Sequence, residues 1–223
     1  MTDLIVFDVD GTLTNTTNVD AECLVGALTE VTERPEISAD WLLYDHSTDS
    51  GIVRQVLFEA GLGADHDAYE RVRQRFFDRM EAAYTANPDL FGPMPGATQA
   101  FSAVKNSGAA VAIATGAWHE SARFKMRVAG VDAYGIPMAT ADDAVDRVDI
   151  LMRAIERVRR WTGVAELGRI TYVGDAVWDV RAANVLGIGF VGLAPTEQDA
   201  QRLTQAGAPV VIASLEELAE VIR

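Results

Sequence analysis

Apolar residues along the chain fall into two patterns, namely short continuous runs and longer stretches in which they recur every three or four positions. Short runs predict strands that are buried on both faces, as in a parallel sheet, whereas the three-to-four spacing predicts amphipathic helices. The predicted strands are residues 4–7, 109–114, 136–139, 169–173, 188–193 and 210–212. The helices predicted around the later strands are residues 97–106, 120–129, 147–161, 177–186, 197–205 and 215–222. This alternation predicts a doubly wound parallel α/β sheet with right-handed crossovers.

A long helical stretch interrupts the alternation after the first strand. Helices are predicted around residues 19–31, 39–44, 51–60 and 67–86. Residues 91–96, Phe-Gly-Pro-Met-Pro-Gly, consist mainly of turn-forming residues and predict a linker back to the sheet. We therefore expect a core domain of residues 1–14 and 95–223, with an all-helical cap domain of residues 15–94 inserted after the first strand.

Two carboxylates stand at the end of the first strand. Asp8 and Asp10 are two residues apart, a spacing that places both side chains on one side of extended backbone. Carboxylates that converge in this way repel unless a cation or a proton lies between them. They also follow the carboxyl end of the strand, where open α/β sheets bind ligands. The alternative for so short a pattern is a solvated acidic turn.

Two later strands end in residues of related chemistry. Thr115 can donate to a phosphate oxygen, and the N–H groups that follow it, beginning with Gly116, add further donors at a helix start. Asp175 ends a buried strand, and Asp179 lies four residues on, in the first turn of the next helix. Hard oxygen ligands gathered in this way suit Mg²⁺. The alternatives are a helix N-cap at Thr115 and an acidic first turn at Asp179.

Composition narrows the classes of partner. Of 223 residues, 49% are hydrophobic, so a packed core is expected, and the formal net charge of −14 argues against a nucleic-acid or anionic-membrane surface. A phosphate site in so acidic a protein would need a metal, backbone N–H groups and a few local cations. The single cysteine, Cys23, fits a reducing compartment. Without a basic leader or a long apolar segment, we expect a cytoplasmic protein with no signal peptide or membrane span.

The string Asp-Val-Asp-Gly-Thr-Leu-Thr at residues 8–14 resembles the first motif of the haloacid dehalogenase superfamily, most of whose members are phosphatases. Thr115 resembles its second motif, and the Gly-Asp-x-x-x-Asp string at residues 174–179 resembles its acidic fourth motif. Among helical-capped members, the chain is similar to the phosphoglycolate phosphatase and β-phosphoglucomutase groups. The resemblance covers the expected core in order, and covers the insert only in its position and helical character.

This resemblance implies a Mg²⁺-dependent phosphatase. Asp8 would attack phosphorus to form an aspartyl-phosphate, and Asp10 would protonate the leaving oxygen and then activate water. Asp8, the backbone carbonyl of Asp10, and Asp175 would hold the metal, with Asp179 orienting Asp175 or a metal-bound water. Thr115 and Gly116 would hold phosphate oxygens.

The third motif departs from the usual pattern, in which a Lys is found. Lys105 precedes the second predicted strand and is expected on the wrong side of the sheet. Lys125 comes about ten residues after Thr115, roughly 12 Å down a helix at about 1.5 Å per residue, and is expected to be too distant. We expect Arg147, at the start of the helix after the third strand, to replace the Lys and grip the phosphate with two N–H groups. The alternative is a surface arginine.

Specificity is expected to lie in the insert, because a helical cap can close over a site and select a small substrate. Candidate substrate contacts are Thr48, Asp49 and Arg54 at the start of a cap helix. Trp118, His119 and Trp178, which follow strand ends, are candidates to line the pocket. The alternatives are an N-capping loop with a surface arginine, and a solvated His119. Cys23 and the stripe that contains Phe76 and Phe77 are expected to form the cap core.

The expected partner is a small phosphorylated metabolite, and the expected protein is a monomer or homodimer. A phosphomutase of the same fold and a catalytically silent phosphate-binding protein remain alternatives. A true dehalogenase is disfavoured, because its relatives lack the second carboxylate of the first motif and Asp10 is present. A signalling receiver domain is disfavoured by the length of the chain, by the insert and by the early position of Asp8.

Overall fold

The computed structural model describes residues 1–163 and 166–222. Within these residues, six parallel strands form one sheet in the order β3-β2-β1-β4-β5-β6. The strands are β1 (Thr2–Phe7), β2 (Ala110–Ala114), β3 (Met138–Ala139), β4 (Leu167–Gly174), β5 (Gly189–Leu193) and β6 (Val211–Ile212). The predicted doubly wound parallel sheet is confirmed, and β1 lies at its centre between β2 and β4.

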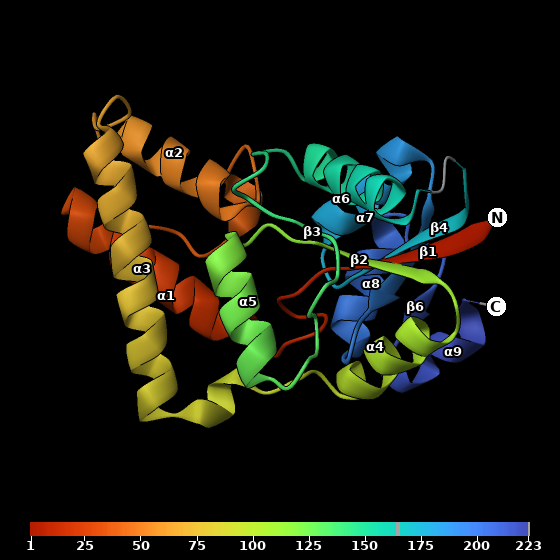
Figure 1. Ribbon diagram of the computed structural model, residues 1–223. Coiled ribbons are helices and arrows are strands. Elements are labelled where there is room, and N and C mark those ends of the chain that lie inside the picture. Colours follow the sequence, from red (N-terminus) through yellow and green to blue (C-terminus); the bar gives the residue numbers. More distant parts are fainter. Residues whose placement is uncertain (164–165, 223) are drawn as a thin grey trace.

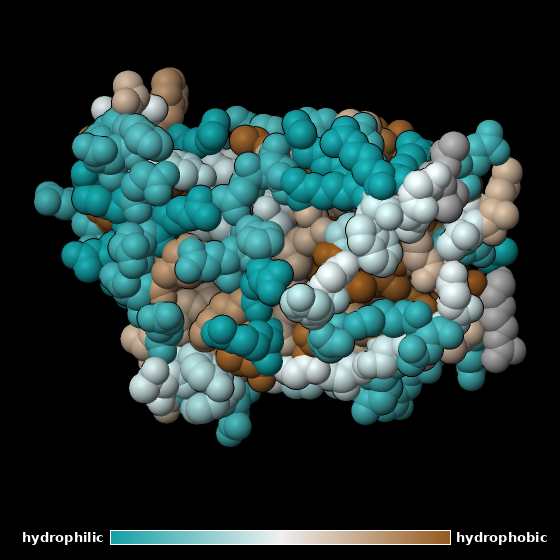
Figure 2. Space-filling view, in the orientation of Figure 1, coloured by the Kyte–Doolittle hydropathy of each residue, from teal (hydrophilic) through white to brown (hydrophobic). Residues whose placement is uncertain are grey.

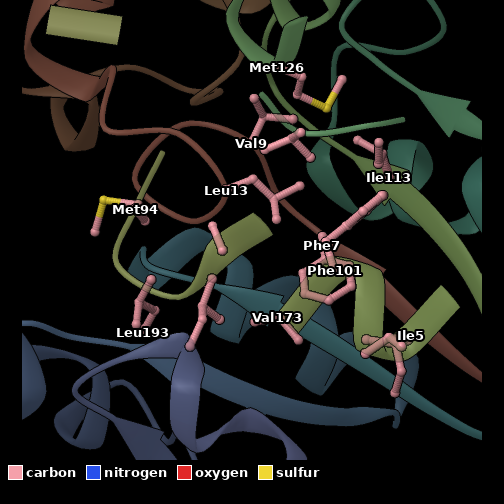
Figure 3. Packing of buried hydrophobic residues seen from close by; sticks show 14 of the residues in the cluster. Ile5, Phe7, Val9, Leu13, Met94, Phe101, Ile113, Met126, Val173 and Leu193 are labelled. Carbon is pink, nitrogen blue, oxygen red and sulfur yellow. The ribbon is translucent and has the colours of Figure 1, made fainter. Parts of the chain in front are cut away.

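Strand β1 is apolar on both faces because helices cover both sides of the sheet. Leu4 and Val6 belong to one buried cluster, and Ile5 and Phe7 belong to the other. The second of these clusters is drawn in Figure 3, where Phe7 lies beside Phe101 with ring centroids 5.5 Å apart. Continuous burial of this kind is what the apolar run predicts for a central parallel strand.

The helices of the core fall into two layers. Helices α4 (Ala97–Asn106), α5 (His119–Val128) and α9 (Leu218–Val221) contribute to the cluster that contains Phe7. Helices α6 (Arg147–Thr162), α7 (Val177–Leu186) and α8 (Glu197–Gln205) contribute to the cluster that contains Val6. Figure 1 shows α6 and α7 above the sheet and α4 and α9 below it. The face seen in Figure 2 is mostly hydrophilic, with hydrophobic residues visible chiefly in the hollows.

Helices α1 (Thr17–Thr32), α2 (Asp49–Glu59) and α3 (His66–Ala86) lie together at the left of Figure 1, between β1 and α4 in the sequence. They enclose a third apolar cluster, which contains Cys23 and Phe76 as expected, while Phe77 is half-buried. The helix predicted at residues 39–44 is wrong. Only the single 3₁₀ turn Trp41–Leu43 forms there, because the Asp40 side chain accepts from the Leu42 N–H and the chain is extended again at Tyr44.

Helix α5 packs in two directions. Met126 belongs to the cluster beneath the sheet, whereas Phe124 packs against Phe91 and Tyr84 of the inserted segment, with ring centroids 5.8 and 5.5 Å apart. Trp118, just before α5, also belongs to the cluster of the inserted helices. Helix α5 therefore packs against both the sheet and the inserted segment. The domain limits at residues 14 and 94 remain a prediction.

The part of the chain that the structure describes contains no helix that is both long and apolar enough to cross a membrane.

The Phe101 ring is 1% exposed and packs against the Phe7 ring at a tilt of 56°, so its removal leaves a cavity beneath the sheet. We expect Phe101→Ala to lower the free energy of unfolding by about 3–5 kcal/mol, measured by urea denaturation. Phe58→Ala is the matched control, because Phe58 is 77% exposed and its loss should change stability by less than about 0.5 kcal/mol. Equal losses at the two positions would contradict the packing described here.

Candidate active site

Four segments of the chain bring polar side chains to the carboxyl edge of the sheet. Asp8 follows β1, Thr115 follows β2, Arg147 begins α6, and Asp175 follows β4. Their convergence follows from topology, since β1, β2 and β4 are parallel neighbours whose carboxyl ends share one edge.

The loop after β1 approaches Asp175 closely because of Gly11. This residue has φ +75°, and a Cβ placed on it would lie 2.1 Å from Asp175 Oδ2, so a larger residue would collide with the carboxylate. The next residue, Thr12, donates its hydroxyl to Asp175 Oδ1 at 3.2 Å. Gly11 and Thr12 therefore join the end of β1 to the end of β4.

Asp8, Asp175 and Asp179 form a compact acidic cluster, with one carboxylate oxygen of each lying within 4.8 Å of the others. Asp179 is fully buried; its oxygens accept from the Ala176 N–H at 3.2 Å and lie 3.0 Å from the Tyr172 hydroxyl. Three converging carboxylates provide the oxygen donor set that a hard divalent cation requires. The residues present therefore fit a metal ion.

Arg147 faces this cluster from the first turn of α6. Its Nη1 lies 3.1 Å from Asp8 Oδ1 and 3.7 Å from Asp179 Oδ1. The Nη2 atom lies 3.4 Å from the Ser47 carbonyl, and the buried Nε has no hydrogen-bond partner among the described residues. Arg147 is thus not a surface arginine. The structure places it beside Asp8, where its donors are available to an anion.

Burial dominates the electrostatics of the cluster. It raises the pKa of Asp8 to about 7, even though Arg147 acts in the opposite direction. Burial likewise raises the pKa of Asp179, and raises that of Asp175 well above its ordinary value. Burial alone would lower the pKa of Arg147, but Asp179 and Asp8 raise it above its ordinary value. A further positive charge at this point would relieve the repulsion between the carboxylates.

The expectation that Lys125 lies too far from the site is wrong. Its ammonium group is fully buried and donates to Asp10 Oδ2 and Asp20 Oδ1, both at 2.6 Å. The expectation counted only the distance along the helix from Thr115. Helix α5 instead lies beside the loop after β1, which carries Asp10 (Figure 1), so the Lys125 side chain reaches Asp10 sideways from the helix. Lys105, by contrast, pairs with Asp132 and contacts none of these acidic residues.

The sequence contained a signal for this contact that our prediction missed. Lys125 lies on the buried side of α5 with Ala122 and Met126, a position where a lysine needs a partner. Asp20 likewise lies on the buried side of α1, near Leu24, where a carboxylate also needs a partner.

The start of α2 is docked against the edge of the sheet. Thr48 Oγ1 donates to the Val145 carbonyl at 2.7 Å, and the Asp49 N–H donates to the Gly116 carbonyl at 2.8 Å. Asp49 Oδ2 in turn accepts from the Trp118 N–H at 2.9 Å. Thr48 and Asp49 therefore lie where the insert meets the segments after β2 and before α6. The neighbouring Ser50, which was not predicted, has a buried hydroxyl with no partner among the described residues.

The other predicted pocket residues lie elsewhere. Trp118 is fully buried rather than pocket-lining, because its indole packs on Phe76 and donates to the Tyr69 hydroxyl at 3.1 Å. Arg54 is exposed and lies over the Tyr69 ring. His119 is also exposed, and its N–H donates to Asp142 at 2.7 Å.

Two further residues were placed near the site by sequence. The Trp178 side chain is half-buried, with an indole nitrogen that has no partner among the described residues. Thr115 is buried, and its hydroxyl accepts from the Ala117 N–H at 3.3 Å. The next residue, Gly116, lies against the Arg147 guanidinium. A Cβ on Gly116 would lie 2.6 Å from Arg147 Nη2, so this glycine lets the guanidinium approach the β2 loop.

Comparison with known sequences gives one family. The family described as haloacid dehalogenase-like hydrolase matches residues 2–187. No curated protein sequence matches the chain.

Several solved structures are similar in fold. A hydrolase from Pseudomonas syringae is 22% identical, with both chains fully covered and a TM-score of 0.75. A predicted phosphoglycolate phosphatase from Haemophilus somnus is 19% identical over 99% of this chain and 97% of its own, with a TM-score of 0.68. A candidate β-phosphoglucomutase from Bacteroides vulgatus is 17% identical over 98% and 86%, with a TM-score of 0.69. At these identities the similarity shows the fold alone.

The raised pKa of Asp8 makes stability depend on pH. Between the unfolded value of 3.8 and the folded value of about 7, the folded chain binds more protons than the unfolded chain, so the free energy of unfolding falls as pH rises through this window. Asp8→Asn removes this loss. With EDTA present, we expect the variant to be more stable than the native chain by about 1–4 kcal/mol at about pH 8, and by little at about pH 4.

Urea denaturation of both proteins across this pH range measures the difference. A difference that does not change between the two pH values would contradict the burial-driven shift in the pKa of Asp8.

Proposed function

Because the chain belongs to the haloacid dehalogenase-like hydrolase family, we propose that it is a Mg²⁺-dependent phosphatase of small phosphomonoesters. The observation that carries the proposal is the position of Asp8. This carboxylate lies 3.1 Å from the Arg147 guanidinium and within 4.8 Å of oxygens of Asp175 and Asp179. A nucleophile between a fixed cation and an acidic metal-binding set matches the requirements of phosphoryl transfer.

In the first step, an Asp8 oxygen attacks phosphorus while the bond from phosphorus to the ester oxygen breaks. The products are an aspartyl-phosphate and an alcohol, whose oxygen takes a proton from the Asp10 carboxyl. Arg147 supplies two parallel donors to the phosphate oxygens, and the Thr115 hydroxyl supplies another. The donors of Arg147 that now face Asp8 and Ser47 would be shared with the bound phosphate.

In the second step, water attacks phosphorus and the bond to Asp8 breaks. The Asp10 carboxylate accepts the proton of the attacking water, so that it returns to its initial state and inorganic phosphate is released. Asp10 thus carries one proton out and one proton back in each turnover.

Asp8, Asp175 and the Asp10 carbonyl would hold the metal, with Asp179 beside them. When bound, Mg²⁺ would supply the positive charge that the buried carboxylates and the phosphate together need. Asp179 is held by hydrogen bonds with the Tyr172 hydroxyl and the Ala176 N–H. It would in turn hold the Arg147 guanidinium in place beside the acidic cluster.

A small substrate is favoured by the docking of α2. The Thr48–Val145 and Asp49–Gly116 hydrogen bonds place the start of α2 next to Gly116 and Arg147, so little room remains for a macromolecule. The name of the similar Haemophilus somnus protein, a predicted phosphoglycolate phosphatase, supports a small phosphorylated metabolite.

Phosphate release from a panel of small phosphomonoesters tests the proposal. We expect release in the presence of Mg²⁺, loss of release in EDTA, and loss with Asp8→Asn, because that variant has no nucleophilic carboxylate at this position. Unchanged hydrolysis by Asp8→Asn would contradict the proposal. Transfer of phosphate to another position of a sugar phosphate, without release, would indicate a phosphomutase.

Arg147 gives a second test with a matched control on the same helix. Arg147→Ala removes the donors that face Asp8, and we expect kcat/KM for phosphate esters to fall by at least about tenfold, measured by steady-state kinetics. Arg153→Ala removes an exposed arginine from α6 and should leave the kinetics unchanged. Similar kinetics for both variants would show that Arg147 does not bind the phosphate.

A further inference from the structure

We propose that Lys125 is a positioning residue, which fixes the Asp10 carboxyl for proton transfer and makes its orientation depend on the docking of helix α1. This inference rests on the proposed function, because it assigns to Asp10 the proton transfers described above. It concerns a residue outside the family motifs found in the sequence.

The first support is the burial of the ammonium group. The Lys125 side chain is fully buried, although it carries a charge whose transfer out of water is costly. Two carboxylates compensate for that cost, Asp10 and Asp20, each with an oxygen 2.6 Å from Nζ. Such an arrangement is expensive to maintain in a merely structural contact, where an apolar side chain of similar size packs as well.

The second support is the way in which both oxygens of Asp10 are held. Oδ2 accepts from Lys125 Nζ, and Oδ1 accepts from the Thr16 hydroxyl, again at 2.6 Å. Hydrogen bonds to both oxygens fix the plane of the carboxyl group as well as its position. The Asp10 side chain nevertheless remains 20% exposed, so the fixed carboxyl is still open toward a substrate.

The third support is the origin of the partners. Lys125 comes from α5, Asp10 from the loop after β1, and Asp20 from α1 of the insert. Lys125 therefore lies between the proton-transfer residue and the insert. If α1 moves away, Asp20 leaves and the position of the ammonium group beside Asp10 changes with it.

Two aryl esters separate this role from a structural one. p-Nitrophenyl phosphate has a leaving group that departs without protonation, whereas the more basic leaving group of phenyl phosphate requires a proton. The parameter kcat/KM reports the step in which the ester bond breaks. We expect Lys125→Met to lower kcat/KM for phenyl phosphate at least about tenfold more than for p-nitrophenyl phosphate. Lys105→Met, which replaces the lysine paired with Asp132, should leave both values unchanged.

Asp20→Asn provides the second variant, because it keeps the size of the side chain if Lys125→Met does not fold. We expect the same selective loss for phenyl phosphate, smaller in size. Equal losses for both esters in a folded variant would show a structural role and overturn the inference while leaving the proposed function in place. A native chain that hydrolyses neither these esters nor any phosphomonoester of the panel would overturn the proposed function and this inference together.

Discussion

Buried negative charge is the constraint on which the rest of this structure depends. Six aspartates meet where the sheet and the insert come together, and they are Asp8, Asp10, Asp20, Asp49, Asp175 and Asp179. Arg147 compensates the group around Asp8, and Lys125 compensates the group around Asp10. Burial, followed by repulsion from neighbouring carboxylates, raises the pKa of Asp8, Asp20, Asp49 and Asp175. Added positive charge at this point would therefore be favoured in the folded chain. Burial of these carboxylates lowers the free energy of unfolding, and perturbed carboxylates gathered at one place are typical of a functional site.

The two cations divide the chemistry between them. Arg147 lies at a helix start and faces the carboxylate that would form the bond to phosphorus, whereas Lys125 lies in the middle of α5 and faces the carboxylate that would move the proton. The planar guanidinium suits the binding of an anion through several donors, and the compact ammonium suits the fixing of single oxygens. In the proposed mechanism, Arg147 would take the place of the lysine that the family pattern leads one to expect, and Lys125 would have a separate role on a different helix.

The sequence predicted the sheet and the acidic cluster for a simple reason. Residues at the carboxyl ends of parallel strands must meet at one edge, so Asp8, Thr115 and Asp175 could be brought together without knowledge of any angle between elements. The apolar stripe of α5 shows that Lys125 needs a buried partner, but which carboxylates it meets depends on how α5 crosses α1, and that angle is not encoded by a local pattern. The 3₁₀ turn at Trp41–Leu43 was missed because a local hydrogen bond from the Leu42 N–H to the Asp40 side chain competes with helix formation.

Helix α5 completes the interior of both the sheet and the inserted helices, with Met126 facing one and Phe124 facing the other. One consequence concerns the evolution and engineering of this chain. Exchange of inserted helices between relatives is one route to engineered variants, and the insert resembles a detachable module only when the sequence is read linearly. In this protein, a transplanted insert would need a host whose own α5 supplies a matching outward face, including the aromatic residues around Trp118. The exchangeable unit is therefore discontinuous in sequence.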